Sequence, residues 1–162
     1  MRHLKLLITA GLGAAALASA GVALGSSAHA SSASTTVSAK KTSLGMILVT
    51  SSGKTLYLDK ADKPPHFACK GGCLTIWPPL KANGTLKATG GAKAADLGKV
   101  KGPGGEQVTY KGHPLYTFVT DSKSNPTSGE GQNGFFVVST SGSMITKSTK
   151  ATSSGGSTST GW

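Results

Sequence analysis

Two cysteines, Cys69 and Cys73, have the most obvious chemistry in the chain, and they flank the three residues Lys-Gly-Gly. A pair at this spacing can form a disulfide, bind a metal or serve as a redox dithiol. Redox-active pairs usually have two intervening residues at the start of a helix, and no pattern predicts a helix here. If the protein is exported, the oxidising surroundings would favour a disulfide between the two cysteines. The two glycines allow a tight turn that brings the sulfur atoms together. We therefore expect a structural disulfide, with metal binding and redox activity as the alternatives.

His66 and His113 are the candidate metal ligands that could complement the two cysteines. Their spacing fits none of the common zinc patterns, so we expect no bound metal. His113 with Met46 or Met144 could supply haem ligands, but the chain has no C-x-x-C-H attachment sequence. We therefore expect no cofactor. An envelope redox protein that binds metal or haem is the alternative function.

The remaining motifs do not predict catalysis. Residues 129–134 match G-x-G-x-x-G, but a Pro/Ser/Thr loop precedes them and a predicted strand follows, whereas a dinucleotide-binding turn follows a strand and opens a helix. Asp59 and Asp62 are the one pair of carboxylates available for acid–base work, and they lie in a predicted turn. We therefore expect no enzymatic activity.

Trp77 precedes two prolines, which predict an extended exit from the cysteine turn. Its indole ring either packs against the disulfide or stacks on a ligand. The sequence leaves both interpretations open.

The elements that must position these residues are strands. Apolar runs at 46–49 and 55–58 flank Ser-Ser-Gly, and runs at 107–110 and 115–119 flank Lys-Gly-His-Pro, which predicts two β-hairpins. Residues 135–138 form a short apolar run typical of a buried strand. We predict an all-β fold, a small domain of two hairpin-containing repeats that pack as a sandwich or barrel-like sheet.

Both predicted hairpins contain G-x-x-L-Y followed five residues later by Asp, at an offset of 59 residues. The motif residues of the two copies are Gly53, Tyr57, Asp62, Gly112, His113, Tyr116, Phe118 and Asp121. We expect buried tyrosine rings with bonded hydroxyls, and aspartates that accept backbone N–H bonds where each strand ends. An architectural role is the first interpretation, and a ligand or calcium site is the alternative.

Four segments, GKTLY, CKGGCLTIWPPL, QVTYKGHPLYTFVTD and SGEGQNGFFVV, strongly resemble the bacterial secreted-repeat proteins, a family of predicted lipoproteins with a Y-x-[FWY]-x-x-D motif. The resemblance covers residues 44–142. The second repeat fits in full, whereas Asp59 in the first stands where an aromatic residue is expected. Because the lipid-attachment cysteine is absent, the resemblance implies an exported, envelope-associated protein without lipidation and with no established reaction.

The first thirty residues have the pattern of a secretory signal peptide. A positive start at 1–5 precedes an apolar stretch at 6–24, and Ala28-His29-Ala30 supplies a cleavage site. A transmembrane anchor is the alternative interpretation. After cleavage near Ala30 we expect no membrane anchor and a protein that is secreted or held at the outer face of the envelope.

Composition divides the remainder of the chain into three parts. Residues 31–43 are rich in Ser, Thr and Ala and predict a flexible linker. Residues 44–146 hold the predicted domain, with repeats at about 44–82 and 98–142. Residues 147–162 predict a disordered Ser/Thr/Gly tail.

The charge of the mature chain is strongly positive. Without the leader, 15 lysines face six acids, for a net charge of +9 and no arginine. Specific nucleic-acid recognition relies on arginine forks and stacking aromatics, so we expect no nucleic-acid partner. Scattered lysines suit anionic cell-envelope polymers or lipid headgroups, or serve solubility alone. The sequence therefore predicts an exported, non-catalytic binding or structural module and no particular oligomeric state.

Overall fold

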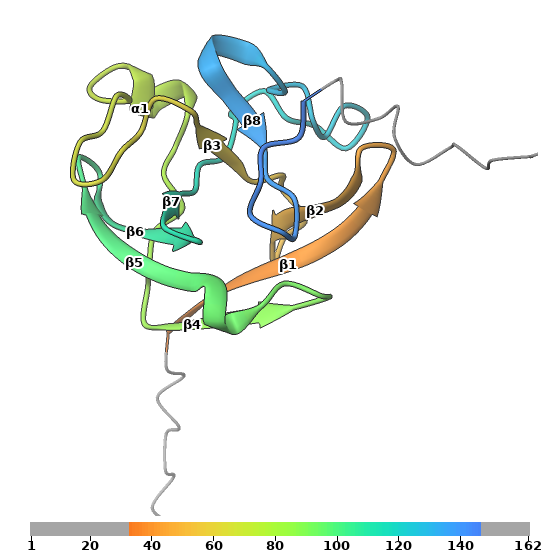
Figure 1. Ribbon diagram of the computed structural model, residues 1–162. Helices are drawn as coiled ribbons and strands as arrows, with labels where there is room; N and C mark the ends of the chain where they lie inside the picture. Colours follow the sequence, from red (N-terminus) through yellow and green to blue (C-terminus); the bar gives the residue numbers. More distant parts are fainter. Residues whose placement is uncertain (1–32, 147–162) are drawn as a thin grey trace, which may run out of the picture. The chain divides into compact units, whose positions relative to one another are not determined.

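The computed structural model describes residues 33–146 (Figure 1). The predicted signal peptide, its cleavage site near Ala30 and the predicted tail at 147–162 lie outside the described residues. Within the described part, no helix has the length and apolar character needed to cross a membrane.

The described chain consists mainly of strands, which confirms the all-β prediction. The strands are β1 (Ser34–Thr42), β2 (Gly45–Thr50), β3 (Tyr57–Asp59), β4 (Thr85–Thr89), β5 (Leu97–Gly102), β6 (Gly105–Tyr110), β7 (His113–Pro114) and β8 (Phe135–Val137). The helix α1 (Cys73–Ile76) and two single 3₁₀ turns, Ala94–Asp96 and Gln132–Gly134, complete the elements. The short helix α1 was not predicted.

Two matching hairpins form the frame of the domain. β1 pairs with β2, and β5 pairs with β6, both antiparallel. The turns end at Gly45 and Gly105, whose φ angles are 101° and 104°, a conformation that glycine adopts without the steric cost of a side chain. Figure 1 shows both hairpins curving below β3 and β8.

After each hairpin the chain turns back and makes the same backbone bond. The N–H of Leu56 donates to the carbonyl of Leu48 at 3.0 Å, and the N–H of Leu115 donates to the carbonyl of Val108 at 3.0 Å. The two repeats therefore have the same local fold, which confirms the predicted internal repeat.

Each repeat also contributes one segment to the backbone hydrogen bonding of the other. Leu80, from the first repeat, donates to Leu115 and accepts from Val108 in the second, both at 2.8 Å. Val138, from the second repeat, makes the corresponding two bonds with the first. Because the closing segments are exchanged, neither repeat completes its backbone hydrogen bonding alone.

The strands are ordered β2-β1-β4, β3-β8 and β5-β6-β7, with β4 parallel to β1. The core between them comprises two clusters. The first contains Ile47, Val49, Tyr57, Cys69, Trp77, Tyr116, Phe118, Phe135, Val137 and Ile145. The second contains Val37, Leu48, Leu56, Leu58, Ala82, Val108, Tyr110, Leu115 and Val138.

The prediction of a flexible linker at 31–43 is wrong, because Ser34–Thr42 is strand β1. Val37 within it is fully buried and pairs with Thr50 in β2 and Ala88 in β4. Serine and threonine predicted a linker by composition. Threonine and valine are nevertheless β-branched residues that suit a strand once neighbouring strands supply hydrogen bonds. The domain therefore begins before the predicted boundary at Leu44.

Val37→Ala tests the contribution of β1 to stability. We expect a loss on the order of 2 kcal/mol in the free energy of unfolding, since the substitution empties buried space between three strands. Val119→Ala is the matched control, because Val119 is 53% exposed and should change stability by less than about 0.5 kcal/mol. Equal, small effects in denaturant unfolding would mean that β1 is dispensable.

Candidate functional site

The two motif tyrosines meet at the centre of the molecule. The N–H of Tyr57 donates to the carbonyl of Tyr116 at 2.9 Å, and the N–H of Tyr116 donates back to the carbonyl of Tyr57 at 2.9 Å. Both residues are fully buried. This reciprocal pair joins the repeats through their backbones.

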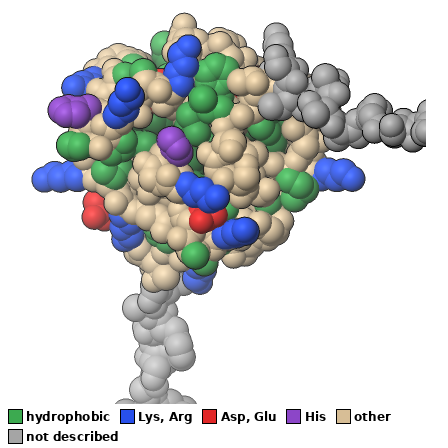
Figure 2. All heavy atoms as spheres, viewed as in Figure 1, with side chains coloured by type: hydrophobic (Ala, Val, Ile, Leu, Met, Phe, Trp, Pro, Cys, Tyr) green, Lys and Arg blue, Asp and Glu red, His purple; other side chains and the backbone are tan. Residues whose placement is uncertain are grey.

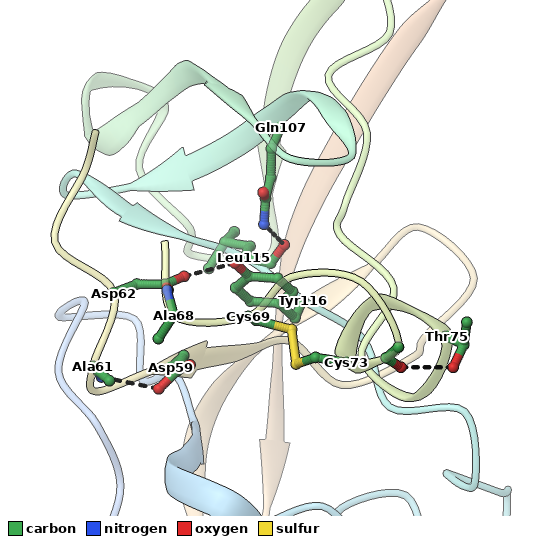
Figure 3. The surroundings of a disulfide bond; sticks show 11 residues. Asp59, Ala61, Asp62, Ala68, Cys69, Cys73, Thr75, Gln107, Leu115 and Tyr116 are labelled. Atoms are coloured by element: carbon green, nitrogen blue, oxygen red, sulfur yellow. Dashed lines mark hydrogen bonds between the residues drawn. A yellow bond between two sulfur atoms is a disulfide. The ribbon is translucent and has the colours of Figure 1, made fainter. Parts of the chain in front are cut away.

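Each tyrosine hydroxyl reaches the aspartate of the other repeat. The Tyr57 hydroxyl donates to the Asp121 carboxylate, 2.8 Å from Oδ2 and 3.0 Å from Oδ1. The Tyr116 hydroxyl donates to Oδ2 of Asp62 at 2.6 Å, as Figure 3 shows. Because an unpaired buried hydroxyl costs about 1–3 kcal/mol, each repeat depends on the other to satisfy its tyrosine.

The same carboxylates hold the loops that follow them. Oδ1 of Asp62 accepts the N–H of Ala68 at 2.7 Å. Oδ1 of Asp121 accepts the N–H of Ser128 at 3.0 Å and its hydroxyl at 2.8 Å. Each motif aspartate therefore ties its own loop to a tyrosine of the other repeat. This geometry favours the architectural interpretation of the motif.

The motif glycines occupy equivalent turns. Gly53 and Gly112 have φ angles of 83° and 81°, which lie in the left-handed region that favours glycine. His113 begins β7 and is exposed, as is His66 in the loop after Asp62. Among the described residues, no group of three histidine, cysteine or acidic side chains could hold a metal ion.

A stack of aromatic rings packs against the tyrosines. Trp77 stacks on Phe135, with centroids 3.9 Å apart, and on Phe118 at 4.2 Å. Tyr57 packs edge-on against Trp77, and Tyr116 packs edge-on against Phe135, both with centroids 5.3 Å apart. Trp77 and Phe135 thus occupy equivalent places in the two repeats. Because Trp77 is 1% exposed and stacks on two protein rings, the structure favours the packing interpretation of this residue.

Asp59 takes the place in the first repeat that Phe118 takes in the second, two residues after the tyrosine. Phe118 covers Trp77, whereas beside Phe135 the corresponding place is a hollow of about 370 Å³ that Asp59 also lines. Oδ1 of Asp59 accepts the N–H of Ala61 at 2.9 Å (Figure 3). The departure from the aromatic pattern therefore replaces a ring contact with a turn-capping carboxylate.

Cys69 and Cys73 form a disulfide beside this hollow (Figure 3). Their Cα atoms are 5.4 Å apart, and Cys73 is the first residue of α1. Cys69 is 1% exposed and belongs to the same core cluster as Trp77. While the bond is intact, neither sulfur is a thiolate that could bind a metal.

Burial governs the electrostatics of the motif. It raises the pKa of Tyr57 and of Tyr116 well above the usual tyrosine range, and the neighbouring carboxylates raise it further. Burial also raises the pKa of Asp121, against the lowering effect of the bonds from Ser128 and Tyr57. The hydroxyls therefore act as fixed donors and not as bases.

Burial likewise raises the pKa of Asp59, and the negative charge of Asp62 adds to the rise. The N–H of Ala61 and the charge of Lys60 act in the opposite direction. The folded state consequently binds the Asp59 proton more tightly than the unfolded chain does. This contribution to stability is present below the ordinary value of 3.8 and is lost as the pH rises through the raised pKa.

Asp59→Asn tests how much stability the protein loses when the buried Asp59 carboxyl ionises. The amide oxygen can still accept the N–H of Ala61, so we expect the variant to match or exceed the wild type in stability at about pH 7. The difference should narrow toward about pH 4, where the wild-type carboxyl binds its proton. Urea unfolding at both pH values measures it, with Glu106→Gln at the surface as the control for net charge. A clear loss of stability at neutral pH would show instead that the fold stabilises the Asp59 charge.

Comparison with known proteins identifies the repeats. A family described as "Secreted repeat of unknown function" matches residues 38–81 and 99–138. The matched segments begin within β1 and β5, the first strands of the two hairpins. Searches of curated proteins and of solved structures found no match. The chain therefore belongs to the family of secreted repeats of unknown function, and residues 38–138 contain two copies of the repeat.

Proposed function

We propose that this protein is an exported, non-catalytic module that binds anionic polymers of the cell envelope through its lysine-rich surface. Membership of a secreted-repeat family is consistent with export. The family description assigns no activity, so the argument for binding comes from the surface of the molecule.

The distribution of charge carries the proposal. All 13 lysines between residues 33 and 146 are exposed. Of the six acids in the same range, only Glu106 is exposed. The molecule therefore presents a more positive surface than its net charge indicates. Figure 2 shows one face, where lysines lie at several points of the outline and few acids are visible.

The fold removes acids from the surface. Asp59 and Asp62 are each 6% exposed, and Asp121 is partly buried with both oxygens bonded. Between residues 33 and 146 the single ion pair joins Lys99 to Glu106 at 3.9 Å. The other lysines in this range form no ion pair with a described acid, and their exposed side chains can reach an external anion.

A binding module also accounts for how the reactive groups are used. The cysteines are bonded to each other and the tyrosine hydroxyls are bonded to carboxylates in the core. A metal site or redox dithiol built on the two cysteines, part of the alternative expectation, would need thiolates that the intact disulfide does not offer. We therefore favour recognition of charge over redox chemistry.

Titration with poly(glycerol phosphate) tests the proposal. We expect binding at about 0.1 M salt that weakens strongly toward about 1 M, because the Debye length falls from about 10 Å to about 3 Å. Uncharged dextran is the control and should not bind. Isothermal titration calorimetry measures both polymers.

Two results would contradict the proposal. One is the absence of heat with the polyanion at low salt. The other is an affinity that does not change with salt, which would indicate recognition of something other than charge.

A further inference from the structure

A hollow of about 460 Å³ opens beside the motif aspartate of the second repeat, and three lysines line it. They are Lys40, Lys54 and Lys123, and all three are exposed. The hydroxyl-bearing residues Ser52 and Ser122 also line the hollow. Its walls thus combine positive charge with hydrogen-bond donors, which is the chemistry of an anion site.

The fold brings the three lysines together from distant parts of the chain. Lys40 lies in β1, in register with Ile47 of β2. Lys54 lies in the turn after β2, where its backbone bonds to Thr50 through both its N–H and its carbonyl. Lys123 lies two residues after the motif residue Asp121. Both repeats therefore contribute to the hollow.

The loop that carries Lys123 is held at both ends. Asp121 at its start accepts bonds from Tyr57 and Ser128. Near its end, the hydroxyl of Thr55 donates to the carbonyl of Pro126 at 2.5 Å. Because the loop is tied to the first repeat at these points, its backbone is held beside that of the first repeat before any ligand arrives, which lowers the entropic cost of binding.

The balance of charge within the hollow is positive. The one carboxylate that lines it is Asp121, whose two oxygens already accept from Tyr57, with Ser128 on Oδ1. Neither Lys54 nor Lys123 belongs to the one ion pair found between residues 33 and 146. Three lysines consequently line the hollow together with one carboxylate that is engaged with its own partners.

We propose that this hollow binds a phosphate group of an anionic ligand. Lysine binds phosphate as a point charge, and three lysines around one hollow suit an anion that offers several oxygens in different directions. The hydroxyls of Ser52 and Ser122 at its wall already share hydrogen bonds with Thr50 and Ser124. The inference rests on the proposed function in that it assigns the anionic polymer a specific site. The phosphate can belong to a wall polymer, to a lipid headgroup or to a free phosphate compound.

Two triple variants with the same net charge test the site. The first replaces the hollow lysines, as Lys40→Gln, Lys54→Gln and Lys123→Gln. The matched control replaces exposed lysines that do not line the hollow, as Lys70→Gln, Lys87→Gln and Lys101→Gln. Thermal unfolding of both variants first establishes that they are folded.

Affinity for poly(glycerol phosphate) at fixed salt is then measured for all three proteins. We expect the first variant to lose at least about tenfold in affinity and the control to lose less than about threefold. Equal losses in the two variants would overturn the inference and leave diffuse attraction by the surface as the binding mode.

A second measurement separates the inference from the proposed function. Pyrophosphate is added to the wild-type protein, and NMR shifts of the Lys54 and Lys123 amides are followed. Shifts without polymer binding would support the hollow as a phosphate site and contradict the proposed function. The absence of both shifts and polymer binding would overturn both.

A third measurement identifies the source of the phosphate. Vesicles of phosphatidylglycerol and of phosphatidylcholine are compared in sedimentation with the wild type and both triple variants. Retention by phosphatidylglycerol that the first triple variant alone loses would support the hollow and assign it a lipid headgroup. Equal retention of both triple variants would contradict lipid binding in the hollow.

Discussion

The exchange of hydrogen bonds between Tyr57, Tyr116, Asp62 and Asp121 is the constraint on which the rest of the structure depends. Each tyrosine hydroxyl is buried and is satisfied by a carboxylate of the other repeat. Each carboxylate in turn holds the loop that follows it. A single repeat would leave a tyrosine hydroxyl and a carboxylate without these partners. Each unpaired buried group would reduce the free energy of unfolding by about 1–3 kcal/mol. The same exchange places Asp62 and Asp121 in contact with buried tyrosines. The charge of the surface is therefore determined mainly by the lysines.

Much of the fold followed from local patterns in the sequence. The chain reversals at residues 51–53 and 111–114 and the repeated Gly, Tyr and Asp were predicted because glycine turns and apolar alternation are local signals. The hairpins β1–β2 and β5–β6 were not predicted. β1 was missed because its residues are mostly Ser, Thr and Lys with Val37 as the one fully buried residue. Its stability comes from strands β2 and β4, and the second of these lies more than forty residues along the chain. The composition of a segment does not reveal a strand partner that lies so far along the chain.

Only part of the site was predicted, because its contacts join residues that lie far apart in the sequence. The tyrosines and aspartates were identified, but the sequence could not show that each pairs with the other repeat, since that pairing depends on how the two copies pack. The equivalence of Trp77 and Phe135 was hidden because their offset is 58 residues, one less than that of the tyrosines. The lysine-lined hollow was missed because Lys40, Lys54 and Lys123 lie in different elements and share no motif. Only the exchanged arrangement of the repeats brings them together.

A double-mutant cycle on unfolding free energies tests the exchange most directly. Tyr57→Phe is combined with Asp121→Ala in one cycle and with Asp62→Ala in a second. Our account predicts a coupling energy of about 1 kcal/mol or more between Tyr57 and Asp121, which share a hydrogen bond across the repeats. It predicts additivity within about 0.5 kcal/mol for Tyr57 and Asp62, which belong to the same repeat. Coupling confined to Tyr57 and Asp62, or additivity in both cycles, would contradict the account.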